Sequence, residues 1–157
     1  MRKLILSLMV GMVLFLSSCG GGSTTPASHD LAGLEGTWDY TIVCNGVISG
    51  SGGSVTYNET FIGYWIIGRN SVIDQDGDPW VWAYDGSTLT LDWGGNETFQ
   101  DPDCGEIYAT GSDHATIPIV SGATTANITG NSNVNFYTEF CGDISGNLPI
   151  TGNMTKR

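Results

Sequence analysis

Residues 80–93 read WVWAYDGSTLTLDW, and this stretch decides the fold. Large apolar side chains stand at every second position on both sides of Asp85-Gly86, so they share one face wherever the chain is extended. Two-residue turns between extended segments favour residues that tolerate positive φ, and Asp-Gly is one of the strongest such pairs. The stretch therefore predicts an antiparallel β-hairpin with one apolar face.

The same alternation recurs along the rest of the chain, and the run 61–67 is apolar on both faces, as is typical of a fully buried strand. Strands are expected at 38–42, 61–67, 80–84, 89–93, 136–140 and 148–154. The expected turns are Asn45-Gly46, Asp76-Gly77, Asp85-Gly86 and Gly94-Gly95. Short turns between neighbouring strands predict an all-β domain built as an antiparallel meander.

The first expected strand opens with Gly36-Thr37-Trp38, which resembles the Gly-x-Trp signature of lipocalin-like proteins. In that family the tryptophan packs across the closed end of a barrel. The resemblance implies an antiparallel up-and-down β-barrel of about eight to ten strands, with an interior that holds an apolar ligand. Pro118 and Pro149 lie inside two late strand candidates, where proline cannot donate to a ladder. A β-sandwich is therefore the alternative.

The composition describes one acidic domain. The 157 residues include 16 acids and five bases, and only Arg69, Lys156 and Arg157 among the bases follow residue 18. A chain that begins at Cys19 would have a formal charge of −13. Such a chain repels phosphate backbones and anionic lipid headgroups, so we expect neither nucleic acid nor an anionic membrane surface as a partner.

Residues 1–18 have the layout of an export signal, with a basic start and an uncharged apolar run that is short for a membrane span. Leu16-Ser17-Ser18-Cys19 resembles the lipobox of bacterial lipoproteins. The resemblance implies that the signal is cut before Cys19, that this thiol receives a diacylglycerol, and that acyl chains then anchor the protein in a membrane. The alternative is an ordinary secretory signal.

Residues 19–33 are expected to form a flexible tether that carries the lipidated Cys19, because the segment is rich in Gly, Ser and Thr. Gly20 follows the cysteine, where Asp would suggest inner-membrane retention in that family. The outer membrane of the cell envelope is therefore favoured. The folded domain is expected at residues 34–157, as a monomer.

Three cysteines remain beyond Cys19, and an exported chain permits a disulfide. In a closed meander the first and last strands are neighbours, so the end of the first strand, at Cys44, would lie beside the turn before the last strand, at Cys141. We predict the pair Cys44–Cys141, with Cys104–Cys141 as the alternative.

The aromatic residues on alternating positions are the candidate ligand site, because aromatic walls bury large apolar areas while indole N–H and phenol O–H groups orient a ligand. This candidate site consists of Trp38, Tyr40, Trp65, Trp80, Trp82, Tyr84 and Trp93. The alternatives are ordinary core packing and an exposed platform for sugar rings.

Two further patterns are weaker. Residues 74–78 resemble the opening of a calcium loop, but the position that such a loop gives to glycine is Pro79, so a hairpin turn is favoured over a loose calcium site. His114 follows Asp113, but the chain has no nucleophile-elbow motif, so we expect no enzyme activity, no resident metal and no cofactor.

Together these patterns predict a cell-envelope lipoprotein with a lipocalin-like domain that binds a small apolar or amphipathic ligand. The alternatives are a structural or protein-interaction module of the envelope with a filled core, and a carbohydrate-binding β-sandwich.

Overall fold

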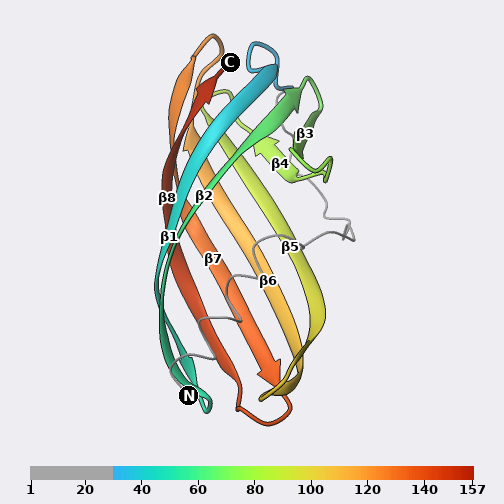
Figure 1. Cartoon of the computed structure of the whole chain (residues 1–157). Coiled ribbons are helices and arrows are strands. Elements are labelled where there is room, and N and C mark those ends of the chain that lie inside the picture. Colours follow the sequence, from blue (N-terminus) through green and yellow to red (C-terminus); the bar gives the residue numbers. More distant parts are fainter. Residues whose placement is uncertain (1–29) are drawn as a thin grey trace.

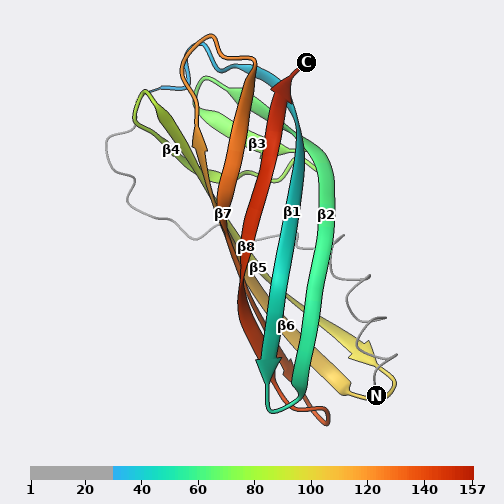
Figure 2. The ribbon, with the colours of Figure 1, turned by 90° about the vertical axis from the view of Figure 1, so that its left-hand side faces the viewer.

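The computed structural model describes residues 30–157, which form eight antiparallel strands (Figures 1 and 2). The strands are β1 (Gly36–Gly50), β2 (Gly53–Gly68), β3 (Ser71–Asp74), β4 (Val81–Tyr84), β5 (Thr88–Asp101), β6 (Gly105–Pro118), β7 (Thr125–Thr138) and β8 (Ile144–Lys156). Within this range, no helix has the length and apolar character needed to cross a membrane. The predicted all-β, up-and-down architecture is confirmed.

The strands form one sheet in the order β3-β2-β1-β8-β7-β6-β5-β4, which curls into a nearly closed barrel (Figure 1). The first and last long strands pair as expected, with Trp38 opposite Lys156 and Cys44 opposite Ile150. Short β3 and β4 meet at the remaining gap, where the Trp80 N–H donates to the Val72 carbonyl at 2.9 Å. The sheet is therefore a barrel, and the sandwich alternative is wrong.

Alternation along each strand sends one set of side chains inside, where they form two buried clusters. The upper cluster, named for its position in Figure 1, contains Trp38 and Trp65 together with aliphatic residues from the first half of β5 and the second half of β6, such as Leu91 and Ile117. The lower cluster contains Ile48, Phe136 and Leu148. Only partly buried side chains such as Ile42 contact both clusters, so the middle of the barrel is less densely filled than its ends.

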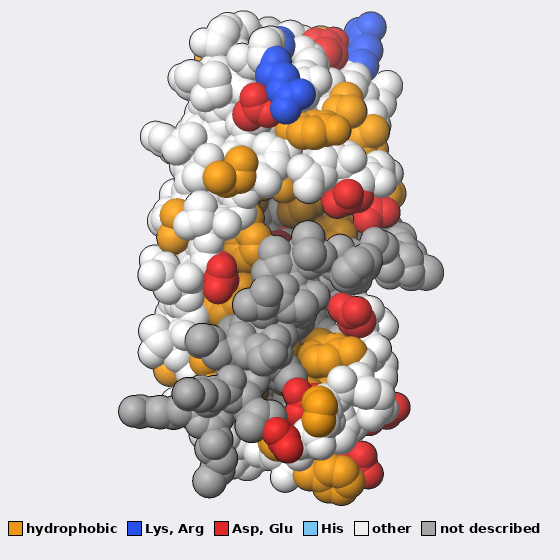
Figure 3. Space-filling view, in the orientation of Figure 1, with side chains coloured by type: hydrophobic (Ala, Val, Ile, Leu, Met, Phe, Trp, Pro, Cys, Tyr) orange, Lys and Arg blue, Asp and Glu red, His pale blue; other side chains and the backbone are white. Residues whose placement is uncertain are grey.

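The barrel has a window in its wall, because β3 pairs only with residues 65–68 of β2, and β4 pairs only with residues 89–92 of β5. Below these short pairings, the facing edges of β2 and β5 have no strand partner within residues 30–157. Figure 1 looks through this window, and Figure 3 shows hydrophobic side chains inside the hollow with acidic side chains beside it. Within the part of the chain that the structure describes, the barrel wall is therefore open at the side.

Two of the expected turns are confirmed and two are wrong. Asp76-Gly77 and Asp85-Gly86 form the turns at either end of β4, with Gly φ values of 90° and 95°. Asn45-Gly46 and Gly94-Gly95 instead lie inside β1 and β5. Gly46 is needed for a close approach, because a Cβ there would lie 2.7 Å from Leu148 Cδ2. Glycine at this position makes room inside the barrel and does not reverse the chain.

The expectation that residues 61–67 are buried on both faces is wrong, because Ile62 is 76% exposed. A single curled sheet has one covered face, and the outer face of β2 lies open to solvent. Phe140, expected on a strand with Phe136, lies in the loop after β7 and is also exposed. Pro149 lies in β8 where pairing with β1 is interrupted, between Cys44–Ile150 and Ser49–Ser145.

Candidate functional site

A cavity of about 440 Å³ occupies the middle of the barrel between the two buried clusters. Side chains of β1, β2, β5, β6, β7 and β8 line it, and the turn between β3 and β4 forms its upper rim. Its volume lies within the range of sites for small molecules. The cavity opens at the window between β2 and β5, since it is also lined by Thr60 and Ile62 from the free edge of β2.

Four of the seven aromatic residues of the candidate site line this cavity together: Tyr40, Trp65, Trp80 and Trp93. Their rings form a continuous series, with centroids 4.4 Å apart for Tyr40 and Trp65, 5.5 Å for Trp65 and Trp80, and 6.3 Å for Trp80 and Trp93. The series crosses from β1 through β2 and the β3–β4 connection to β5. It forms an aromatic wall on the window side of the cavity.

The other three aromatic residues belong to the upper core and do not line the cavity. Trp38 is fully buried, and its indole N–H donates to the Leu34 carbonyl at 2.7 Å. The Tyr84 hydroxyl donates to the Ile119 carbonyl, and Trp82 packs against the same cluster. The polar groups of Trp38 and Tyr84 therefore make hydrogen bonds within this end of the barrel.

Trp65 has an unused donor. Its side chain is 1% exposed, yet its Nε1 has no hydrogen-bond partner among the described residues. A buried N–H without a partner costs free energy, and such groups in native proteins commonly face a water or a ligand. Beside it, Gly63 gives the Tyr40 ring its place, because a Cβ there would lie 2.5 Å from the Tyr40 hydroxyl oxygen.

Asp113 is a cavity residue that the sequence analysis did not select. It lies on the inner face of β6, opposite Trp93 of β5 and Ser132 of β7. Burial raises the pKa of the Asp113 carboxyl, and a hydrogen bond with the Ser132 side chain lowers it by less. The alternation of buried positions from Ile107 to Ile117 could have identified Asp113, because it assigns position 113 to the same inward face.

The charge of Asp113 also contributes to raised pKa values of two groups across the cavity. Burial and then the charge of Asp113 raise the pKa of the Cys44 thiol to about 11. Burial followed by the charges of Asp74, Asp76 and Asp113 raises the pKa of the Tyr40 hydroxyl to about 12. Groups on β1 therefore face the carboxyl on β6 across the same space.

The segment considered for calcium forms the hairpin turn that was favoured. One Asp74 carboxylate oxygen accepts the backbone N–H of Asp76 at 3.0 Å and that of Asp78 at 2.9 Å. The other accepts the Trp80 indole N–H at 3.4 Å. Within residues 30–157, no group of three or more His, Cys, Asp or Glu side chains is arranged to hold a metal ion. Asp74 is thus used to shape the cavity rim.

The predicted disulfide Cys44–Cys141 is wrong. The structure pairs Cys104 with Cys141, and Cys44 is a buried free thiol in the cavity wall. β1 continues six residues beyond Cys44 to Gly50, so the loop before β8 lies beside Gly52, whose N–H donates to the Asp143 carbonyl. The bridge therefore joins two loops at the lower end of the barrel, as in the alternative.

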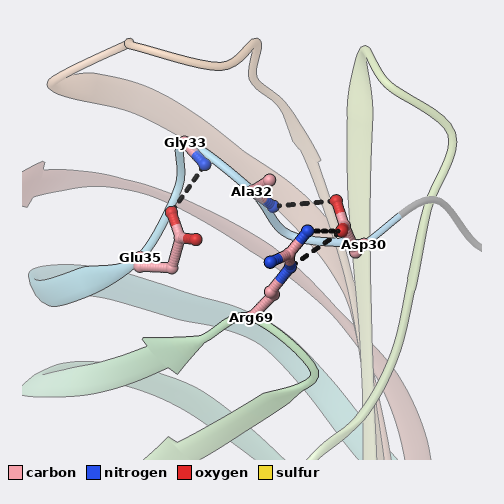
Figure 4. Close-up of polar contacts among 5 residues, drawn as sticks. All are labelled: Asp30, Ala32, Gly33, Glu35 and Arg69. Atoms are coloured by element: carbon pink, nitrogen blue, oxygen red, sulfur yellow. Dashed lines mark hydrogen bonds and ion pairs between the residues drawn. The ribbon is translucent and has the colours of Figure 1, made fainter.

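The chain enters the barrel at the upper end through a strap at residues 30–35, shown in Figure 4. Leu31 is fully buried, and Asp30 pairs with Arg69 at 2.9 Å. The Gly33 N–H donates to the Glu35 carboxylate, which stabilises the turn before β1. Residues 30–33, assigned to the tether by composition, therefore contact the barrel. The predicted signal, lipobox and Cys19 lie outside the described residues.

His114 lies on the outer face, away from the cavity. Its Nδ1 lies 2.7 Å from a carboxylate oxygen of Asp92, so its acidic partner is not the adjacent Asp113. Thr116 is its other neighbour, with the hydroxyl 3.4 Å from Nε2. This pair joins β5 to β6 on the surface.

Comparisons with protein-family models, with curated proteins and with solved structures gave no match to this chain. The cavity is therefore the feature of this protein that points to a function.

Proposed function

We propose that this protein is a cell-envelope lipoprotein whose lipocalin-like domain binds a small apolar or amphipathic ligand inside the barrel. The observation that carries this proposal is the cavity of about 440 Å³ with its aromatic wall and side entrance. A filled-core module has no use for such a space, because native interiors are otherwise close-packed. A sugar platform needs exposed rings, whereas Trp65 is buried.

The chemistry of the lining fits a ligand with an apolar body. The lower half of the cavity is lined by aliphatic and aromatic side chains, among them Ile42, Phe61, Val134 and Leu148. Polar groups gather higher, at Asp113, at the Trp65 indole and at the β3–β4 turn. An apolar wall with a few polar groups at one side is typical of small-molecule sites, where the polar groups orient the ligand.

The test uses an uncharged dye, N-phenyl-1-naphthylamine, with the full chain reconstituted in phosphatidylcholine nanodiscs. We expect saturable dye emission above that of empty nanodiscs, together with energy transfer from tryptophan. Val134→Phe narrows the cavity from β7 and should weaken binding about tenfold or more. The matched control is Val47→Phe, since Val47 is 58% exposed on the outside of β1. Equal titrations of both variants and the parent chain would refute binding in the cavity.

Anchoring has a separate test. Cys19→Ala removes the predicted acylation site, so we expect the protein to move from the membrane fraction to the soluble fraction after export. If the variant stays with the membrane in the same proportion as the parent chain, the lipoprotein assignment is wrong, and the cavity proposal is unaffected.

A further inference from the structure

The cavity has acidic side chains and lacks internal basic partners. Asp113 lies in its wall, and Asp74, Asp76 and Asp78 surround its upper rim. The described residues that line the cavity include no Lys, Arg or His. Buried carboxylates are normally paired, because removing a charge from water is costly. The acidic side of the cavity is therefore electrostatically incomplete as residues 30–157 build it.

The basic side chains of residues 30–157 are used elsewhere. Arg69 pairs with Asp30 at 2.9 Å in the strap, and Arg157 pairs with Asp39 at 2.6 Å on the outer face of β1. Lys156 places its ammonium group 5.7 Å from the ring centre of Trp38 at the upper end. These three residues are the only lysines and arginines in that range, so the described part of the chain has no further Lys or Arg side chain to bring to the cavity.

Acidic groups continue below the rim, on the two strands that border the window. Glu97 follows Trp93 on the inner face of β5, opposite the fully buried Ala109. Its Oε2 is buried without a hydrogen-bond partner among the described residues. Glu59 of β2 pairs in register with the inward-facing Cys44 and is exposed at the window. A positively charged ligand would therefore be attracted along the whole entrance.

The aromatic wall also favours a positively charged ligand. The faces of indole and phenol rings carry negative electrostatic potential and attract organic cations at short range, most strongly where water is excluded. Trp93 lies beside Asp113 in the sheet register, and Tyr40, Trp65 and Trp80 continue the wall toward the acidic rim. Carboxylate and ring faces thus converge on one part of the cavity.

We infer that the ligand is a hydrophobic organic cation, an amine or quaternary ammonium group on an apolar body, with the cation between Asp113 and the aromatic wall and the apolar body in the lower cavity. This inference rests on the proposed function, since it names the chemical class that the same cavity takes. Hydrated metal ions are disfavoured, because the lower cavity wall is aliphatic and aromatic.

The test compares three probes of one shape: 3-phenylpropyltrimethylammonium, its uncharged tert-butyl isostere and 3-phenylpropylsulfonate. Each is titrated by calorimetry into the full chain in phosphatidylcholine nanodiscs, with empty nanodiscs subtracted. We expect the cation to bind at least tenfold more tightly than the isostere, and the sulfonate to bind more weakly than both. Equal affinities for the cation and the isostere would overturn the inference while leaving the cavity proposal standing. Failure of all three probes and of the uncharged dye would refute the cavity proposal itself.

Asp113→Asn then identifies the carboxylate responsible. It should weaken binding of the cation about tenfold and change the affinity for the isostere less than twofold. The matched control is Asp92→Asn, which removes the same charge from the outer face of the neighbouring strand β5, where Asp92 contacts His114. If both variants weaken cation binding equally, net charge and not the cavity explains the preference, and the inference is wrong.

Discussion

Removing the Cys104–Cys141 bridge is expected to lower the free energy of unfolding by about 4 kcal/mol. The bridge closes a loop with a sequence separation of 37, and the chain-entropy relation for a loop of this length gives that value near 25 °C. For a folded domain of about 130 residues, the same change lowers the melting temperature by about 10–15 °C. Most of this loss should appear whether the bridge is reduced or removed by mutation.

The assay is thermal unfolding followed by tryptophan emission and by circular dichroism at the β-sheet band. The double variant Cys104→Ala/Cys141→Ala removes the bridge without leaving a single thiol from the pair. The matched control is Cys44→Ala, which keeps the bridge and loses only the packing of one buried thiol, at a cost of about 1 kcal/mol.

The two candidate pairings give opposite results for the control. If Cys44 were bridged to Cys141, Cys44→Ala would lose the full stabilisation, and peptide mapping without reductant would show that cross-link. Such a result would refute the argument that β1 runs past Cys44 to Gly50. If the double variant has the same melting temperature as the parent chain, the stabilisation calculated from loop entropy is wrong.

Three other outcomes follow from buried groups. Burial raises the pKa of Asp113 in the folded state, so the folded chain holds this proton more tightly, and the group's contribution to stability declines as pH rises from its unfolded pKa through its folded one. In urea titrations the stability of Asp113→Asn relative to the parent chain should therefore increase as pH rises above about 4, the usual pKa of an unfolded aspartate, and a constant difference would contradict this. The Cys44 thiol, with a pKa of about 11, should react with iodoacetamide near pH 8 about 100-fold more slowly than a free thiol, and rapid labelling would show an open cavity wall. Leu31→Ala should cost about 2–4 kcal/mol because Leu31 is fully buried, whereas a tether residue would cost nothing measurable in the same urea titration.

The sequence predicted the architecture well because alternation is a local signal. The residues of each strand indicate by themselves which face points inward, and the two residues Asp85-Gly86 indicate a turn. Asn45-Gly46 has the same composition as a turn but lies inside β1. Glycine serves both to reverse a chain and to admit a neighbouring side chain, and only the position of Leu148 across the barrel distinguishes the two.

The wrong disulfide followed from that same pair of residues. A turn at Asn45-Gly46 would end the first strand at Cys44 and bring it to the loop that holds Cys141. Because β1 runs on to Gly50, Cys44 instead faces Ile150 in the middle of β8. Strand length is set by pairing with strands that are distant in the sequence. The wrong assignment of a turn at Asn45-Gly46 therefore led to the wrong cysteine pair.

The candidate site was predictable only in part, for a related reason. Alternation identifies which aromatic side chains point inward, but not how far along the barrel each one lies. Trp38 and Trp65 are direct partners in the β1–β2 register and both belong to the upper cluster, yet only Trp65 also lines the cavity. The sequence analysis considered Asp113 only as the neighbour of His114, although alternation along β6 places Asp113 on the inner face.

The short hairpin formed by β3 and β4 sets the height of the window. Both strands have four residues, while the strands beside them, β2 and β5, have 16 and 14. The height of the window therefore depends on one small segment that contributes little to the other strand pairings. Lengthening the hairpin by pairs of alternating residues would extend the wall downward without altering the opposite side of the barrel. The residence time of the proposed ligand would then change independently of the contacts that select it, so exchange rate and selectivity would be separable properties of this architecture.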